Sequence, residues 1–314
     1  MKNGPVVIFG GAGFVGANLA HRLLEEGESV RIFDDLSRPR AERNMEWLRD
    51  LHDGGFELLA GDVRDPDAVD EASAQASAIY HVASRVATAT RLADPAHELA
   101  VDLRGTLNVL EAARKRRDAL PLVFTANSTV PGTAGHADQY VLGYAKRFGL
   151  RALFLCASNV YGPRQLGNED EGWVAHLVKR SLACEPIAIY GDGHQVRDLL
   201  FIDDLVDALL LARKHVDELA GQAFLLGGGA GNSATVLELI DLLEELSGEK
   251  ADLVFCGERP GEPRQFVTDA RRFAAKTGWS AKTTVREGLR ELHLWLSFPH
   301  EKRRPFPVAV RTAS

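Results

Sequence analysis

The sequence predicts an α/β protein with a doubly wound parallel sheet and a small α/β region after it. Three observations lead to this class. Short apolar segments alternate with amphipathic segments through the first half of the 314 residues. A glycine-rich segment joins the first apolar segment to the first amphipathic one. After residue 160 the alternation becomes less regular, so we expect a second and smaller region there.

The first half of the chain contains the segments that predict the parallel sheet. Strands are expected at residues 5–9, 29–35, 56–62, 78–84, 121–127 and 151–160. Helices are expected between them, at residues 14–27, 42–53, 65–75, 100–117 and 137–149. The longest of these helices carries an apolar face that includes Leu103, Leu107 and Leu110. Repeated strand–helix units of this kind place helices on both faces of the sheet.

The second half of the chain mixes helices with short strands. Helices are expected at residues 172–184, 203–216, 234–248 and 284–296, and strands at 186–194 and 222–228. We expect residues 1–160 to form the first domain, with about 195–230 returning to it. Residues 161–296 are expected to form mainly the second region, which would bind the substrate, and residues 297–314 a tail.

Composition and charge disfavour several classes of protein. A net charge of −7 disfavours binding to nucleic acid or to an anionic membrane, because both need clustered positive charge. No apolar run reaches the ~18 residues of a membrane span, and the N-terminus lacks a signal-peptide pattern. Cys156, Cys184 and Cys256 lie far apart, so reduced thiols and no metal site are expected. We expect a soluble cytoplasmic protein, and the sequence leaves its oligomeric state open, a homodimer included.

The segment GGAGFVG (residues 10–16) follows the first strand and opens the first helix. Gly10, Gly13 and Gly16 allow a tight turn, close approach of a pyrophosphate to backbone N–H groups, and close helix–strand packing. Asp34 follows Gly16 by 18 residues and ends the second strand, where it would bind the ribose hydroxyls of adenosine. A glycine pattern alone is also compatible with a flexible loop, but the strand, helix and acid together predict a dinucleotide site.

The cofactor is expected to be NADH or NADPH. Asp34 favours NAD, whereas Ser37, Arg38 and Arg40 would suit a 2′-phosphate or simply form a solvated turn. Further residues at strand ends would contact the adenine, the pyrophosphate and the nicotinamide ribose, with ordinary turn chemistry as the alternative. The residues expected from the strand–turn–helix pattern to bind the cofactor are Gly10, Gly13, Phe14, Val15, Asp34, Ser37, Arg38, Asp62, Val63, Val82, Ala83 and Ser84.

A series of motifs carries a family resemblance. In chain order they read GGAGFVG, GDVRD, YHVAS, RGTLNVLEAA, SNVYGPRQ, YGDGHQVRDLLFIDDLVDA and RPGEPR. From Val6 to about Trp295 the chain resembles the extended short-chain dehydrogenase/reductases, especially sugar-nucleotide epimerases of the CDP-tyvelose type. The resemblance implies a Rossmann domain with a small C-terminal substrate domain. It also implies that the 127 region, Asn159 and Val160 surround the nicotinamide.

The catalytic residues of that family are missing. The family uses a Ser or Thr and a Tyr-x-x-x-Lys pair, whose tyrosine transfers the proton of the reacting oxygen. Asn127 stands at the Ser/Thr position, Pro131 replaces a tyrosine, and Ala134 stands near the place of the lysine. None of the five tyrosines has a lysine four residues later. We therefore assign no catalytic residue.

Several residues near this gap are weak candidates for a replacement. The resemblance implies that the family carries an inserted segment after the position of Asn127, which this chain lacks. Asn127, Ser128 and His136 are the weak candidates in the shortened segment that remains. Tyr140 and Tyr144 are expected to be core-facing aromatic residues of the following helix.

Three interpretations fit a cofactor site without this triad. The first is a sugar-nucleotide epimerase with a rearranged site, supported by Arg197 and Arg259, which the resemblance implies lie around the nucleotide diphosphate. Loss of the general base that removes the hydroxyl proton would slow that reaction roughly 10²–10⁴-fold. The second is a cofactor-binding pseudoenzyme or sensor.

The third interpretation is the one the sequence analysis favours: a one-way NAD(P)H-dependent ketoreductase. Its substrate would be a flat aromatic polyketide of the angucyclinone type, whose own hydroxyl stabilises the alkoxide. The chain also resembles the atypical polyketide ketoreductase type of simocyclinone biosynthesis, which lacks the catalytic triad. This resemblance implies an enzyme of antibiotic biosynthesis.

Overall fold

A computed structural model describes residues 4–83, 100–116, 118–127, 137–168, 172–261 and 263–298. Its centre is a seven-stranded sheet in the order β11-β6-β5-β4-β1-β2-β3, with every neighbouring pair parallel. The strands are β1 (Val6–Phe9), β2 (Val30–Asp34), β3 (Phe56–Ala60), β4 (Ala78–His81), β5 (Leu122–Asn127), β6 (Ala152–Ala157) and β11 (Ala223–Leu226). The strand order reverses between β1 and β4, and this switch point is where parallel α/β sheets bind ligands.

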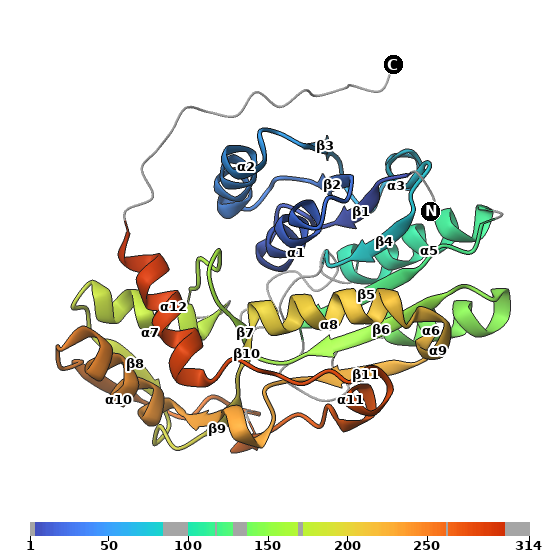
Figure 1. Cartoon of the computed structure of the whole chain (residues 1–314). Helices are drawn as coiled ribbons and strands as arrows, with labels where there is room; N and C mark the ends of the chain where they lie inside the picture. The colour runs from blue at the N-terminus through green and yellow to red at the C-terminus, as the bar shows by residue number, and fades with distance from the viewer. Residues whose placement is uncertain are drawn as a thin grey trace.

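Helices cover both faces of this sheet (Figure 1). They are α1 (Phe14–Glu25), α2 (Pro39–His52), α3 (Pro66–Ser73), α5 (Gly105–Lys115), α6 (Ala137–Phe148), α8 (Ile202–Lys214) and α9 (Val216–Leu219). Successive strand residues point to opposite faces, so Val6 and Ile8 join one buried cluster and Val7 and Phe9 the other. The first cluster includes buried side chains of α1, α2 and α8, and the second includes those of α3, α5 and α6.

The remaining elements form small sheets and further helices, of which the helix at residues 271–277 packs on β11. The strands are β7 (Val160–Tyr161), β8 (Ile187–Tyr190), β9 (Val196–Asp198), β10 (Leu200–Phe201), β12 (Ser233–Thr235), β13 (Leu253–Cys256) and β14 (Gln265–Phe266). The helices are α7 (Trp173–Leu182), α10 (Val236–Ser247), α11 (Arg271–Thr277) and α12 (Val285–Ser297), with shorter turns at Ala100–Arg104 and Ala230–Asn232. β7 pairs with β10, β8 with β13, and β9 with both β12 and β14.

Two buried carboxylates join segments that are far apart in the chain. Asp198 accepts hydrogen bonds from the Ser158 hydroxyl at 3.0 Å and the Thr268 N–H at 3.2 Å. Its burial raises the pKa of the Asp198 carboxyl above its ordinary value. Asp204 accepts from the N–H groups of Lys282 and Thr283 at 2.9 and 3.0 Å. These bonds fix the ends of β6 and α8 against the C-terminal third of the chain.

The predicted fold class is confirmed. The differences lie at element boundaries and in short elements that the sequence did not predict, among them β9, β10, β13, β14 and α11. The expected 151–160 strand divides into β6 and β7, because Asn159 has a positive φ of 40° that interrupts the extended backbone. The expected 100–117 helix starts as a π-helical turn over Ala100–Arg104 before α5. No helix in the described ranges is both long enough and apolar enough to cross a membrane. The proposed domain boundaries remain a prediction, although β11 does return to the main sheet beside β6.

Candidate active site

The turn between β1 and α1 requires glycine at two positions. Gly10 has a φ of +81°, and a Cβ there would lie 2.6 Å from the backbone of Ala83, just after β4. A Cβ on Gly16 would lie 2.2 Å from the Gly10 carbonyl oxygen. Gly13 differs, because its Cβ would meet only that same oxygen, at 3.2 Å. Gly13 is the N-cap of α1, so its open side faces the end of a helix where backbone N–H groups favour an anion.

Asp34 ends β2 directly beside this turn. Its carboxylate accepts hydrogen bonds from the N–H of Ala12 at 3.0 Å and the N–H of Leu36 at 2.9 Å. Burial raises the pKa of the Asp34 carboxyl above its ordinary value, and these two N–H groups offset part of that effect. The remaining acceptor capacity of the carboxylate can serve hydroxyl groups in the groove described below.

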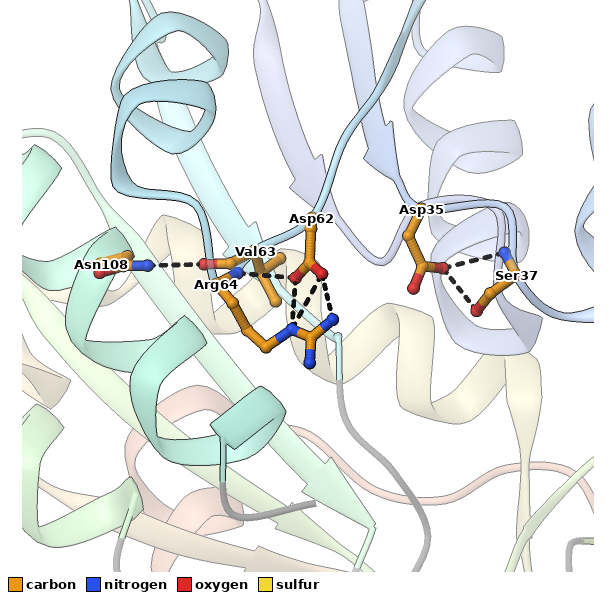
Figure 2. Close-up of polar contacts among 6 residues, drawn as sticks. All are labelled: Asp35, Ser37, Asp62, Val63, Arg64 and Asn108. Atoms are coloured by element: carbon orange, nitrogen blue, oxygen red, sulfur yellow. Dashed lines mark hydrogen bonds and ion pairs between the residues drawn. The ribbon is translucent and has the colours of Figure 1, made fainter. Parts of the chain in front are cut away.

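Figure 2 shows further polar groups at the segments that follow β2 and β3. Asp35 accepts hydrogen bonds from the N–H and hydroxyl of Ser37, at 3.0 and 2.8 Å. The Asp62 carboxylate forms an ion pair with the Arg64 guanidinium and also accepts from the Arg64 N–H at 2.8 Å. Asn108 of α5 donates its side-chain amide to the Val63 carbonyl at 2.8 Å, which holds the segment after β3 in place. These contacts build one end of a groove from hydrogen-bonded turns.

An open groove runs along the carboxyl ends of the strands, past the switch point. All the residues expected to bind the cofactor line this groove except Ser84 and Asn159. Ser84 lies outside the described residues. Asn159 is buried instead, with its side-chain oxygen accepting from the Trp173 indole N–H at 3.2 Å. The structure therefore brings together the side chains that the sequence had placed at separate strand ends.

Other lining residues were not identified from the sequence. They are Asp35, Ala41, Gly61, Val101, Thr125, Ala157, Gln165, Gly172 and Leu205. Asp35 follows Asp34, and Thr125 and Ala157 lie at or near the ends of strands, so the strand-end rule could have found them. Gln165, Gly172 and Leu205 have no such local signal, because they reach the groove only through the folding of distant segments.

The segment that lacks the family's triad lies partly beyond the described residues. Asn127 ends β5, paired in register with Ala157 of β6. Ser128, Pro131, Ala134 and His136 fall outside the described ranges.

Neither tyrosine of α6 lines the groove. The Tyr144 hydroxyl donates to the Glu111 carboxylate at 2.7 Å, and Tyr140 is 40% exposed. The expectation that both are core-facing aromatics is wrong for Tyr140, because it lies on the solvent side of the helix.

One buried histidine ends β4, one residue before the groove-lining Val82. His81 is 3% exposed and lies edge-on to Phe9 and Phe124, with ring centroids 6.1 and 5.4 Å away. Neither ring nitrogen has a hydrogen-bond partner in the described part of the chain. Burial lowers the pKa of His81 from 6.5 to about 4, so the ring is neutral at physiological pH.

Comparison with known families agrees with this geometry. A model of the NAD dependent epimerase/dehydratase family matches residues 6–136 and 135–227. The chain belongs to this family. The match covers more than half of the sequence and includes the glycine-rich turn, Asp34 and all seven strands of the main sheet.

Individual relatives are sugar-nucleotide enzymes. The chain is 30% identical to CDP-paratose 2-epimerase of Salmonella typhi, over 93% of this chain and 99% of that one. It is 27% identical to UDP-glucose 4-epimerase of Thermotoga maritima, solved with UDP-glucose, with a TM-score of 0.80 over 93% and 98% of the chains. It is 26% identical to UDP-glucose 4-epimerase of Thermus thermophilus, solved with NAD, with a TM-score of 0.80 over the same shares.

These findings confirm the resemblance to the extended family and correct the expected activity. The expected ketoreductase acting on an aromatic polyketide is wrong, because the similar proteins named above are epimerases of sugar nucleotides. The missing triad suggested a ketoreductase, whereas the motifs along the whole chain already resembled epimerases. The cofactor associated with this family is NAD.

Proposed function

We propose that the protein is a sugar-nucleotide epimerase that binds NAD in the groove and has a rearranged acid–base site. The observation that carries the proposal is the match to CDP-paratose 2-epimerase over 93% of the chain, together with a groove lined by the expected cofactor residues. A relative of this similarity supports the reaction class, and the groove supports the cofactor.

The residues present fit NAD. The open side of Gly13 and the N-terminal N–H groups of α1 would hold the pyrophosphate. The Asp34 carboxylate would accept from the adenosine ribose, and Asp62 from the adenine amino group. Two carboxylates, Asp34 and Asp35, line the groove here and would repel a 2′-phosphate, so we propose NAD rather than NADP despite Arg38 and Arg40 nearby. Bound NAD would supply a hydride acceptor for the sugar alcohol.

The acid–base step is the part of the site that is rearranged. The carboxylates and guanidinium groups among the described lining residues all lie near Asp34, at the adenosine end. The other end is lined by side chains such as Thr125 and Gln165, which do not titrate near neutral pH. Of the three weak candidates, Asn127, Ser128 and His136, only His136 has an ordinary pKa suited to proton transfer. We therefore propose His136 as the residue to test first as the base.

The sugar nucleotide would lie toward the smaller sheets. Arg197 is buried on β9, and the Arg259 guanidinium lies 3.9 Å from the centre of the Tyr190 ring. Guanidinium groups suit a diphosphate because they donate several hydrogen bonds in a fixed plane. These two residues are the proposed contacts of the nucleotide diphosphate.

The test is epimer interconversion. The purified protein with NAD is incubated with CDP-, UDP- and dTDP-hexoses, and the sugar protons are followed by NMR. The proposal expects one of these sugars to reach a mixture of two epimers, and His136→Ala to slow that conversion by about 10²-fold or more. NAD binding without conversion of any sugar would contradict the proposed activity and favour a cofactor-binding protein without chemistry.

A further inference from the structure

Gln165 is the groove residue whose place the proposed function leaves unexplained. It follows β7 and lines the groove together with Val160 and Gly172. A Cβ on Gly172 would lie 2.7 Å from the Gln165 side-chain carbonyl carbon, so the glycine lets this side chain lie close to the backbone. The side chain therefore packs against the backbone of the following segment.

The segment that carries Gln165 is held against the first two helices. Asn18 of α1 donates to the Pro163 carbonyl at 3.2 Å, and the Arg164 guanidinium lies 3.8 Å from the centre of the Trp47 ring on α2. A positive φ of 75° at Arg164 turns the chain back toward the groove. Gln165 is thus presented by a turn that contacts both α1 and α2.

The hydrogen bonds of Gln165 determine which end of its amide is unused. Its side-chain N–H₂ donates to the Val160 carbonyl at 2.9 Å, so the amide oxygen must point the other way. Gln165 is 6% exposed, and its Oε1 has no hydrogen-bond partner among the described residues. A buried acceptor left unpaired is uncommon and calls for a donor, and none lies within the described ranges of the chain.

A second glutamine provides a matched comparison. Gln195 also donates its side-chain N–H₂ to the carbonyl five residues earlier, that of Tyr190, at 2.7 Å. Its Oε1 is likewise buried and unpaired within the described ranges. Gln195 does not line the groove, so the two residues differ in location and share their local structure.

The position of Gln165 in the groove indicates the donor. Asp34 and Asp62, at the ends of β2 and β3, mark the adenosine end. Gln165 lies with Val160 and Ala157, beyond the switch point, where the nicotinamide half of a bound dinucleotide would extend. We propose that Gln165 Oε1 accepts a hydrogen bond from the carboxamide N–H₂ of the nicotinamide and so fixes the orientation of that ring. This inference rests on the proposed binding of NAD.

The experiment compares three ligands by calorimetry. NAD carries the carboxamide, 3-acetylpyridine adenine dinucleotide carries a methyl group in place of its N–H₂, and ADP-ribose lacks the ring. The wild-type protein should bind NAD about tenfold more tightly than the acetylpyridine analogue. Gln165→Met should bind the two dinucleotides equally, and it should bind ADP-ribose as the wild type does. Gln195→Met should keep the wild-type preference for NAD.

Any other outcome overturns the proposed contact between Gln165 and the carboxamide. Equal wild-type affinity for NAD and the analogue contradicts the carboxamide contact without any variant, so the test does not depend on the folding of Gln165→Met. A parallel loss of affinity for ADP-ribose in Gln165→Met would assign the side chain to the ribose or to structure alone. A wild-type protein that binds neither NAD nor ADP-ribose would remove the proposed function as well, which separates that failure from this one.

Discussion

The carboxylate of Asp34 lies 3.0 Å from the backbone nitrogen of Ala12, so the end of β2 is hydrogen-bonded to the glycine-rich turn after β1. Its other oxygen accepts from the N–H of Leu36 at 2.9 Å. One side chain thereby orders the turn that would hold the pyrophosphate and faces the position proposed for the ribose. Stability and cofactor affinity should depend on Asp34 together.

Replacing Asp34 tests this dual role. Asp34→Ala leaves two partly buried N–H groups, those of Ala12 and Leu36, without an acceptor and should lower the free energy of unfolding by about 1–2 kcal/mol. It should also weaken NAD binding by about tenfold or more, and NAD more than NADP, because the contact with the 2′-hydroxyl is lost. Urea unfolding and calorimetry measure the two effects. Asp35→Ala is the comparison, since Asp35 is exposed and its carboxylate accepts from the neighbouring turn: stability and NAD affinity should stay near wild type, while NADP binds more tightly because one repelling carboxylate is gone. A larger loss for NADP would contradict the ribose assignment.

The glycines of the first turn should respond differently to alanine. Gly16→Ala places a methyl group 2.2 Å from the Gly10 carbonyl oxygen and should destabilise the fold by about 2 kcal/mol or more. Gly13→Ala meets that oxygen only at 3.2 Å, so the fold should persist while NAD affinity falls by about tenfold or more. Thermal unfolding and NAD titration separate the two variants. A Gly13→Ala protein with wild-type affinity would place the pyrophosphate elsewhere.

Neither tyrosine of α6 should replace the missing catalytic tyrosine. Tyr144→Phe removes a hydroxyl that donates to Glu111, and Tyr140→Phe changes a side chain that is 40% exposed. Each variant should keep the rate of epimer interconversion within about tenfold of the wild type, measured by the same NMR assay. A loss of roughly a thousandfold from either change would identify a relocated catalytic tyrosine.

His81 should make the fold sensitive to acid. Because its folded pKa of about 4 lies below the ordinary value of 6.5, the unfolded chain binds a proton in this range that the folded chain does not. The His81 contribution to stability is therefore intact above pH 6.5 and is lost as the pH falls toward 4. Between pH 7 and 4.5, wild type should lose about 2–3 kcal/mol more unfolding free energy than His81→Leu. Parallel pH profiles for the two proteins would mean that His81 gains a proton without cost.

The parts of this molecule that could be predicted from sequence are local patterns. Strand–helix alternation and the spacing from Gly16 to Asp34 are determined by neighbouring residues, and both reappear in the structure. Gln165 and Leu205 could not be predicted, because they reach the groove only when segments more than 100 residues from the glycine-rich turn fold against it. The substrate class was mispredicted for another reason. The absence of a catalytic tyrosine restricts the mechanism of proton transfer but says little about which molecule the remaining site binds.

Calorimetric titration of the wild-type protein with NAD shows whether the groove binds this dinucleotide. The groove at the carboxyl ends of β1, β2 and β3 is proposed to hold this dinucleotide even though the chain has no Tyr-x-x-x-Lys pair. We expect saturable binding of one NAD per chain, with weaker binding of NADP. Absence of any heat of binding with millimolar NAD would contradict it, because every role proposed for the groove requires that cofactor.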